Sequence, residues 1–129
     1  MSARINISSN APWEDKVGYS RAVKINNNIF VSGTTATNEN GEIVGVNDPY
    51  IQTKQCIKNI KTALEKGGAQ LEDVVRVRIY VVNIDDWEII SKAFSESFKN
   101  IKPAATMVEV NRLISKEILV EIEADAYLT

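Results

Sequence analysis

Residues 74–82 have the sequence VVRVRIYVV, in which apolar and polar side chains alternate. Because successive side chains of a strand point to opposite faces of a sheet, this run predicts a strand with one apolar and one mixed face. The apolar face is expected to carry Val75, Val77, Ile79 and Val81, and the mixed face Arg76, Arg78 and Tyr80.

A helix is expected before this strand, over residues 49–66. Asp48 suits the N-cap because its carboxylate accepts free amide hydrogens of a first turn, and Pro49 fits the first helical position. Gly67-Gly68 predicts the end of the helix. Between these limits, apolar or small side chains recur at helical spacing, at Thr53, Cys56, Ile57, Ile60, Ala63 and Leu64. We therefore interpret the Cys56 side chain as a buried structural thiol.

A second helix is expected after the strand, with Asp85-Asp86 as its cap. Its apolar side chains recur at helical spacing, and we interpret them as core rather than as part of a cofactor site. They are Trp87, Ile90, Phe94 and Phe98.

Shorter strands are expected towards both ends of the chain. Residues 21–25 and 29–33 flank a run of asparagines that suits a hairpin loop. Residues 42–46 are a candidate for a short third strand. Residues 104–110 and 118–128 predict two last strands, paired as a hairpin.

These elements predict an α+β fold in a single domain over residues 1–129, with both helices covering one face of a mixed sheet. The uncovered face still carries apolar side chains beside its charges, at Tyr80, Val82, Met107 and Tyr127. A monomer would expose them as a large patch, so we expect this face to pack against other copies of the chain.

The composition excludes several classes of function. The chain lacks histidine, which removes Ser-His-Asp and Cys-His catalysis, histidine-dependent RNA cleavage and the commonest zinc ligand, and we expect no metal. The 15 basic residues are scattered among 17 acidic ones, giving a net charge of -2 and no stripe for nucleic acid. No apolar run suits a bilayer or a signal peptide, so no membrane contact and a cytoplasmic location are expected.

Short segments spread in order over nearly the whole chain resemble one family. They are Ala11-Pro12, Gly18-Tyr19-Ser20, Val31-Ser32-Gly33, Gly41-Glu42, Gly67-Gly68-Ala69, PAATMVEV at 103–110 and VEIEADA at 120–126. The set resembles the YjgF/RidA family, also called Rid or endoribonuclease L-PSP-like proteins. The resemblance implies a chorismate-mutase-like fold and a homotrimer that binds a small molecule in clefts between subunits.

The resemblance also implies a chemistry and a set of site residues. Family members with deaminase activity hydrolyse 2-imino or enamine acids to keto acids and ammonia without a cofactor. A cleft arginine binds the substrate carboxylate, and a glutamate positions the water. That glutamate corresponds to Glu121, and other cleft positions correspond to Tyr19, Ser32, Gly33, Ser91 and Met107. The position of the arginine is occupied by Ala105, as in the divergent branch without this residue.

A methyl group cannot replace the paired hydrogen bonds of a guanidinium, so we expect little hydrolysis of 2-iminopropanoate. Arg78 or Arg21 is a candidate substitute cation. Arg78 has the alternative of a structural ion pair with Glu109, Glu121 or Glu123, and a structural role is also the alternative for Arg21. Glu121 likewise is either a general base or one end of a salt bridge.

The sequence thus leaves the function open between two classes. One is a hydrolase acting on an imine, an enamine or a related metabolite, and the other is a non-enzymatic trimer that binds a metabolite or a protein. An endoribonuclease is disfavoured because histidine and a basic patch are both missing.

Overall fold

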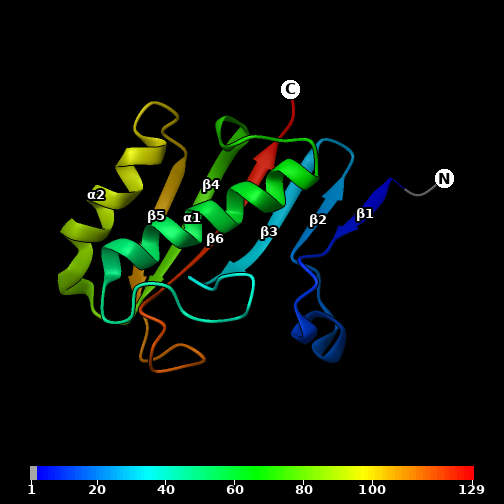
Figure 1. Ribbon diagram of the computed structural model, residues 1–129. Coiled ribbons are helices and arrows are strands. Elements are labelled where there is room, and N and C mark those ends of the chain that lie inside the picture. Colours follow the sequence, from blue (N-terminus) through cyan, green and yellow to red (C-terminus); the bar gives the residue numbers. More distant parts are fainter. Residues whose placement is uncertain (1–2) are drawn as a thin grey trace.

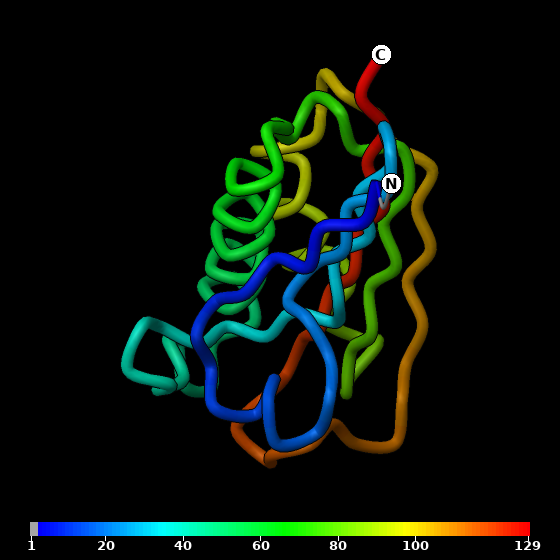
Figure 2. The backbone as a smooth tube through the Cα atoms, turned by 90° about the vertical axis from the view of Figure 1, so that its right-hand side faces the viewer, coloured from blue at the N-terminus to red at the C-terminus, as the bar shows by residue number. Residues whose placement is uncertain are grey.

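The computed structural model describes residues 3–129 and contains one six-stranded sheet with two α-helices on one of its faces. Figure 2 shows the helices on one side of the sheet and its other side uncovered by any helix. The strands are β1 (Arg4–Ile7), β2 (Ala22–Ile25), β3 (Asn28–Thr34), β4 (Val74–Val81), β5 (Ala104–Glu109) and β6 (Val120–Tyr127), and the helices are α1 (Pro49–Lys66) and α2 (Trp87–Phe98). Their order in the sheet is β1-β2-β3-β6-β4-β5 (Figure 1). The predicted α+β class and the mixed sheet under two helices are confirmed.

Helix α1 has the bounds that its sequence predicts. The Asp48 carboxylate accepts a hydrogen bond from the Ile51 amide at 3.0 Å, and Pro49 occupies the first turn. The helix ends before Gly67, and Gly68 adopts a φ of +81°, which an L side chain rarely tolerates. The buried face includes Cys56, as expected.

Helix α2 begins differently from the prediction. Asp86 is the N-cap, but its side chain makes no capping hydrogen bond. A 3-10 turn at Ile84–Asp86 precedes the helix, and Asn83 and Glu109 accept its amide hydrogens at 3.0 and 3.1 Å. Trp87 is 53% exposed, so its placement in the core was wrong. The helix begins at Trp87 and turns this side chain outward, while Ile90 and Phe98 are buried.

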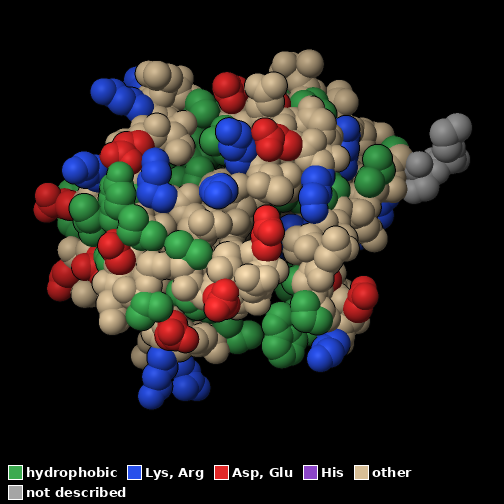
Figure 3. All heavy atoms as spheres, in the orientation of Figure 1, with side chains coloured by type: hydrophobic (Ala, Val, Ile, Leu, Met, Phe, Trp, Pro, Cys, Tyr) green, Lys and Arg blue, Asp and Glu red, His purple; other side chains and the backbone are tan. Residues whose placement is uncertain are grey.

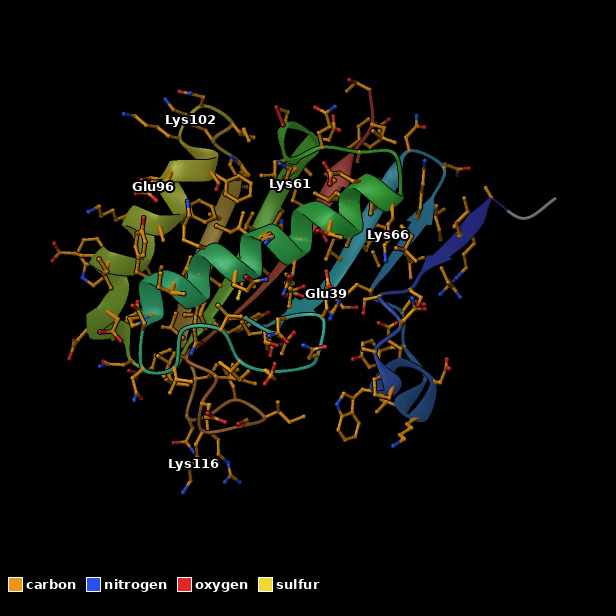
Figure 4. All side chains as sticks on the ribbon, viewed as in Figure 1. Glu39, Lys61, Lys66, Glu96, Lys102 and Lys116 are labelled. Atoms are coloured by element: carbon orange, nitrogen blue, oxygen red, sulfur yellow. The ribbon has the colours of Figure 1, made fainter. Side chains whose placement is uncertain are left out.

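The two helices are linked on their outer side. Glu96 of α2 accepts a hydrogen bond from the Tyr50 hydroxyl at 2.5 Å and pairs with the Lys54 ammonium of α1 at 3.1 Å. Figure 4 shows Glu96 on α2 and Lys61 on α1, on the helix-covered side of the molecule. Within residues 3–129, no helix is long and apolar enough to span a bilayer.

The last two strands do not form the predicted hairpin. β5 pairs in parallel with β4 at the edge of the sheet, whereas β6 lies between β3 and β4 and is antiparallel to both. The reason is that β4, α2 and β5 form a βαβ unit, in which the connecting helix returns the chain to a parallel neighbouring position.

The N-terminal region also differs from the prediction. β1 pairs with β2, and a π-helix spans Glu14–Gly18, in a region for which no strand or helix was predicted. Residues 42–46 form no strand, and their contribution is one isolated bridge between Thr37 and Ile43.

A β-bulge changes the faces at the start of β4. Val74 is opposite Ala126, but Arg76 is opposite Asp125, so Val75 is an extra residue and is 52% exposed. Its placement on the apolar face was therefore wrong. Beyond the bulge the alternation holds: Val77, Ile79 and Val81 are buried under the helices, and Arg76, Arg78 and Tyr80 are not.

The helix-free side of the sheet is called the open face below. Its apolar side chains include Phe30, Val108 and Tyr127, which are 48%, 42% and 45% exposed. Met107 was expected on this face, but it is paired in register with buried Ile79 and packs against the core under the helices. The prediction for Met107 was wrong because the parallel β4–β5 pairing places Thr106 and Val108 on the open face instead.

Candidate functional site

The structure places Ser32, Gly33 and Glu121 close together on the open face of β3 and β6, and Arg21 connects Gly33 with the Tyr19 ring. The pairing of β3 with β6 is irregular at this point, because Val31 is opposite Ala124 whereas Thr34 is opposite Ile122. Ser32 and Gly33 therefore form a bulge, a feature that often redirects groups near functional sites. We call these four residues together with Arg21 the Glu121 cluster.

Gly33 makes room for the Glu121 carboxylate. A Cβ atom placed on Gly33 would overlap the Glu121 Oε2 atom and would lie 3.1 Å from Cδ. The carboxylate thus lies directly on the bare backbone of the bulge. Gly33 and Glu121, which the resemblance assigns to one site, are thus in contact, and their role in that site stays a prediction.

Backbone contacts fix the other members of the cluster. The Ser32 hydroxyl donates to the Ser20 carbonyl at 2.7 Å, and the Ser32 amide donates to the Arg21 carbonyl at 3.0 Å. Arg21 Nη2 donates to the Gly33 carbonyl at 2.6 Å. The Arg21 guanidinium also lies over the Tyr19 ring, with its carbon 5.9 Å from the ring centroid.

Glu121 is partly buried and unpaired. Within residues 3–129, its carboxylate makes no hydrogen bond and has no cationic nitrogen within 4.0 Å. Burial raises the pKa of Glu121, nearby Glu123 raises it further, and Arg21 opposes both effects. A carboxylate with a raised pKa and free lone pairs suits proton transfer to and from water.

Arg78 belongs to a neighbouring network on the open face, in which Tyr80 is opposite Glu121. Its Nη1 atom lies 3.5 Å from the Asp125 carboxylate and 4.0 Å from that of Glu123. The Tyr80 hydroxyl donates to Glu123 at 2.5 Å, and this bond raises the pKa of Tyr80. The structure therefore favours the structural ion pair for Arg78, with Glu123 among the expected partners and Asp125 as an additional one.

The remaining predicted site residues lie elsewhere. Ala105 and Met107 are on the edge strand β5, in register with Val77 and Ile79 of the buried face, and Ser91 is on α2. Figure 1 shows α2 and β5 at the same end of the sheet, remote from β1. One chain therefore does not place Ser91, Ala105 and Met107, which we call the β5-side group, in the Glu121 cluster.

A buried acid beside the cluster was not anticipated. Glu14 is 5% exposed and accepts hydrogen bonds from the hydroxyl groups of Ser8 at 2.9 Å and of Ser9 at 2.5 Å. Burial alone would raise the pKa of Glu14, but these bonds and the charge of Arg21 lower it. No local pattern marks Glu14, since its partners come from the loop that leads into the π-helix. A hollow of about 390 Å³ lies between Glu14, Gly18, Tyr19 and Ser20.

Two other chemistries find no support in the described residues. Cys56 is fully buried, its Sγ lies 3.7 Å from the Val120 carbonyl, and burial raises the pKa of the thiol. Within residues 3–129, no group of three or more His, Cys, Asp or Glu side chains has the arrangement of a metal site.

A family model and the sequences of known proteins relate this chain to the same family. Residues 9–128 match the family model described as Endoribonuclease L-PSP. A RutC family protein of Pyrococcus abyssi is 46% identical over 110 residues, which cover 84% of this chain and 85% of the relative. A protein of Acinetobacter baylyi named 3-aminoacrylate deaminase RutC is 32% identical over 110 residues, covering 85% of this chain and 86% of the relative.

Solved structures agree with the sequence comparisons. Rv2704 of Mycobacterium tuberculosis, a member of the YjgF/YER057c/UK114 family, has a TM-score of 0.88 and 42% identity, covering 97% of this chain and 99% of that one. The α+β fold is thus the fold of that family. The chain belongs to the Endoribonuclease L-PSP family, which is the YjgF/RidA family that its sequence resembles.

Proposed function

We propose that this protein is a cofactor-free hydrolase of a small imine or enamine, working as a homotrimer with its sites in clefts between subunits. The observation that carries the proposal is the Glu121 carboxylate, which lies on the bare backbone of Gly33, is partly buried and has no partner among the described residues. Such a group is free to bind and orient a water molecule.

The chemistry needs one acid-base group and a water molecule. Glu121 accepts a proton from the water as its oxygen bonds to the carbon of the C=N group. The proton then passes to the nitrogen, which leaves a carbon that carries a hydroxyl and an amino group. Glu121 next takes the hydroxyl proton and gives a proton to the nitrogen as the C–N bond breaks, so that a carbonyl compound and ammonia leave. An enamine enters the same route after it takes up a proton on carbon and becomes an imine. The raised pKa of Glu121 makes its carboxylate a stronger base than an ordinary glutamate, which favours its taking a proton from water.

The separation of the predicted site residues supports the trimer. The Glu121 cluster is on the open face, whereas the β5-side group lies across β6 and β4 from it, on the edge strand and α2. A second copy packed on the open face can bring its β5 edge to the Glu121 cluster and also cover exposed Phe30 and Tyr127.

The relatives and the sequence narrow the substrate class. One relative is named 3-aminoacrylate deaminase, an enzyme for an enamine acid whose carboxylate is not attached to the reacting carbon. Ala105 offers no charge to a carboxylate attached to that carbon, as in 2-iminopropanoate. We therefore favour enamine acids of the 3-amino type. RNA cleavage is disfavoured because histidine is absent and the 15 basic residues are scattered among 17 acidic ones; on the face that Figure 3 shows, basic and acidic side chains are mixed.

The test is hydrolysis of two substrates by wild type and Glu121→Gln. Each substrate is generated enzymatically in the assay, and its disappearance and the released ammonia are followed. We expect hydrolysis of 3-aminoacrylate, little hydrolysis of 2-iminopropanoate, and a loss of about 100-fold or more in Glu121→Gln. Binding of a retained metabolite without any turnover would contradict the proposal and favour the non-enzymatic alternative.

Ala105→Arg is the companion variant. It restores the guanidinium at the position where the family's arginine is expected, so hydrolysis of 2-iminopropanoate should rise. Equal wild-type activity on both substrates, with no gain in Ala105→Arg, would contradict the substrate assignment. Light scattering of the wild type should give the mass of three chains, and a monomer would contradict the shared cleft.

A further inference from the structure

We infer that Arg21 is the anion-binding residue of this site, and that it selects substrates carrying a carboxylate. The inference deepens the proposed function, on which it rests for the location of the substrate beside Glu121. The anion-binding cation then comes from the same chain as Glu121, and it is not the arginine that the family has at the position of Ala105.

Arg21 is held in place by contacts that leave its charge uncompensated. Its Nη2 atom is bound to the Gly33 carbonyl at 2.6 Å, and the Tyr19 ring lies beside the guanidinium. The Nε atom is fully buried without a hydrogen-bond partner, which is costly for a donor on a charged group. Nη1 has no hydrogen-bond partner within residues 3–129 either, and it is not among the fully buried atoms.

The other arginine near the middle of the open face is a useful contrast. Arg78 is neutralised by Asp125 and Glu123, at 3.5 and 4.0 Å. Arg21 has no carboxylate within 4.0 Å among the described residues, although it is close enough to Glu121 and Glu14 to affect their pKa values. The unpaired Arg21 guanidinium and the unpaired Glu121 carboxylate thus both contact Gly33 of the same short bulge.

This arrangement fits a ligand with two different ends. A carboxylate accepts charge-assisted hydrogen bonds from the free side of the Arg21 guanidinium. The reacting carbon and its nitrogen then lie towards Glu121, whose negative charge stabilises an iminium group and repels a second carboxylate. The substrate class is therefore a small imine or enamine with one carboxylate that is not attached to the reacting carbon, as in the 3-amino type favoured above.

The experiment measures binding of an unreactive pair of equal shape, crotonate and crotonamide, by titration calorimetry. Wild type should bind crotonate about 10-fold to 100-fold more tightly than crotonamide, since hydrogen bonds between charged groups are the strong ones. Arg21→Gln should abolish this preference, because the amide carries no charge. Arg21→Lys should keep part of the preference for crotonate, because lysine retains the positive charge but lacks the planar guanidinium.

Arg76→Gln is the matched control, because Arg76 is an exposed arginine on the open face, and it should bind as wild type does. Thermal melting and light scattering establish that each variant is folded and assembled. If Arg21→Gln does not fold or assemble, the test rests on Arg21→Lys. An unchanged preference in the Arg21 variants, or no binding of crotonate by wild type, would overturn the inference. Because no turnover is measured, this failure is distinguishable from a failure of Glu121-dependent hydrolysis.

Discussion

Gly33 is the residue where the local backbone and the chemistry meet most closely. Its φ lies outside the left-handed range, so an alanine is tolerated by the backbone itself. The added methyl group would nevertheless occupy the position of Glu121 Oε2. The glycine is therefore explained by the space that the carboxylate needs, and not by the conformation of the bulge.

Gly33→Ala is expected to lower hydrolysis by about 100-fold, because the displaced carboxylate no longer orients water in the reactive position. The free energy of unfolding should change by less than about 1 kcal/mol, since the end of a long side chain can move aside. Steady-state rates and urea unfolding test the two parts. In a Glu121→Asp background, the shorter acid avoids the methyl group, so the substitution should cost less. An equal cost in both backgrounds would contradict the contact.

The Glu121 carboxylate should also lower the free energy of unfolding at neutral pH. Burial raises the pKa of Glu121 in the folded chain above its value in the unfolded chain. At high pH Glu121 is ionised in both states, and its charge then costs more free energy in the folded chain. Glu121→Gln should therefore raise the melting temperature at pH 7. The advantage should shrink as the pH falls through the raised pKa and vanish below the ordinary value of 4.5, where the acid is neutral in both states.

Glu123→Gln is the control for this measurement. Glu123 accepts the Tyr80 hydrogen bond and lies near Arg78, so its loss should destabilise the protein at pH 7. A lower melting temperature for Glu121→Gln at pH 7 would show that the Glu121 carboxylate has a stabilising partner.

At the scale of elements, the two helices differ in how they begin. The Asp48 carboxylate accepts the Ile51 amide hydrogen, whereas the Asp86 side chain caps nothing. Asp48→Ala should lower the free energy of unfolding by about 1 kcal/mol, and Asp86→Ala should change it by less than about 0.5 kcal/mol. Urea unfolding of both variants measures the difference. Equal losses would contradict the capping geometry.

The elements also explain which features the sequence can predict. Helix α1 is predicted to its limits because Asp48, Pro49 and Gly67 are local signals within one element. The pairing of β5 with β4, and the bulge at Val75, depend on partners far away in the sequence, and alternation alone carries no information on them. For the same reason, alternation alone predicted the wrong face for Met107.

The candidate site follows the same rule. Tyr19, Ser32, Gly33 and Glu121 were assigned by resemblance, and their contacts in the structure are consistent with one site. The unpaired state of Arg21 and the burial of Glu14 arise from side-chain contacts between the N-terminal loop, β2 and β3. No spacing in the sequence reveals such contacts.

At the scale of the whole molecule, the open face determines how the chain can work. The row of acids on β6 is partly balanced by Arg78, and exposed Phe30, Val108 and Tyr127 lie on the same face. A face of this kind suits contact with another copy of the chain better than contact with water. If that copy brings its β5-side group to the Glu121 cluster, every active site consists of two halves from different chains.

The two-half site predicts complementation between inactive variants. Glu121→Gln removes the acid from one half, and Ala105→Trp fills the other half at a position that is exposed in the single chain. Each variant alone should be inactive. Every trimer that contains both variants has one cleft in three that combines two intact halves, so about a third of the wild-type activity should return once the trimers of a single variant are removed.

The variants are co-expressed with different tags, purified through both, and assayed for hydrolysis of 3-aminoacrylate. A mixture of Glu121→Gln with Gly33→Ala is the matched control, because both changes affect the same half and no cleft is restored. Light scattering of Ala105→Trp alone must give the mass of a trimer, so that its inactivity is not a failure of assembly. Mixed trimers of Glu121→Gln and Ala105→Trp that stay as inactive as the control would mean that all groups needed for hydrolysis come from one chain, and the clefts would then have no part in the reaction.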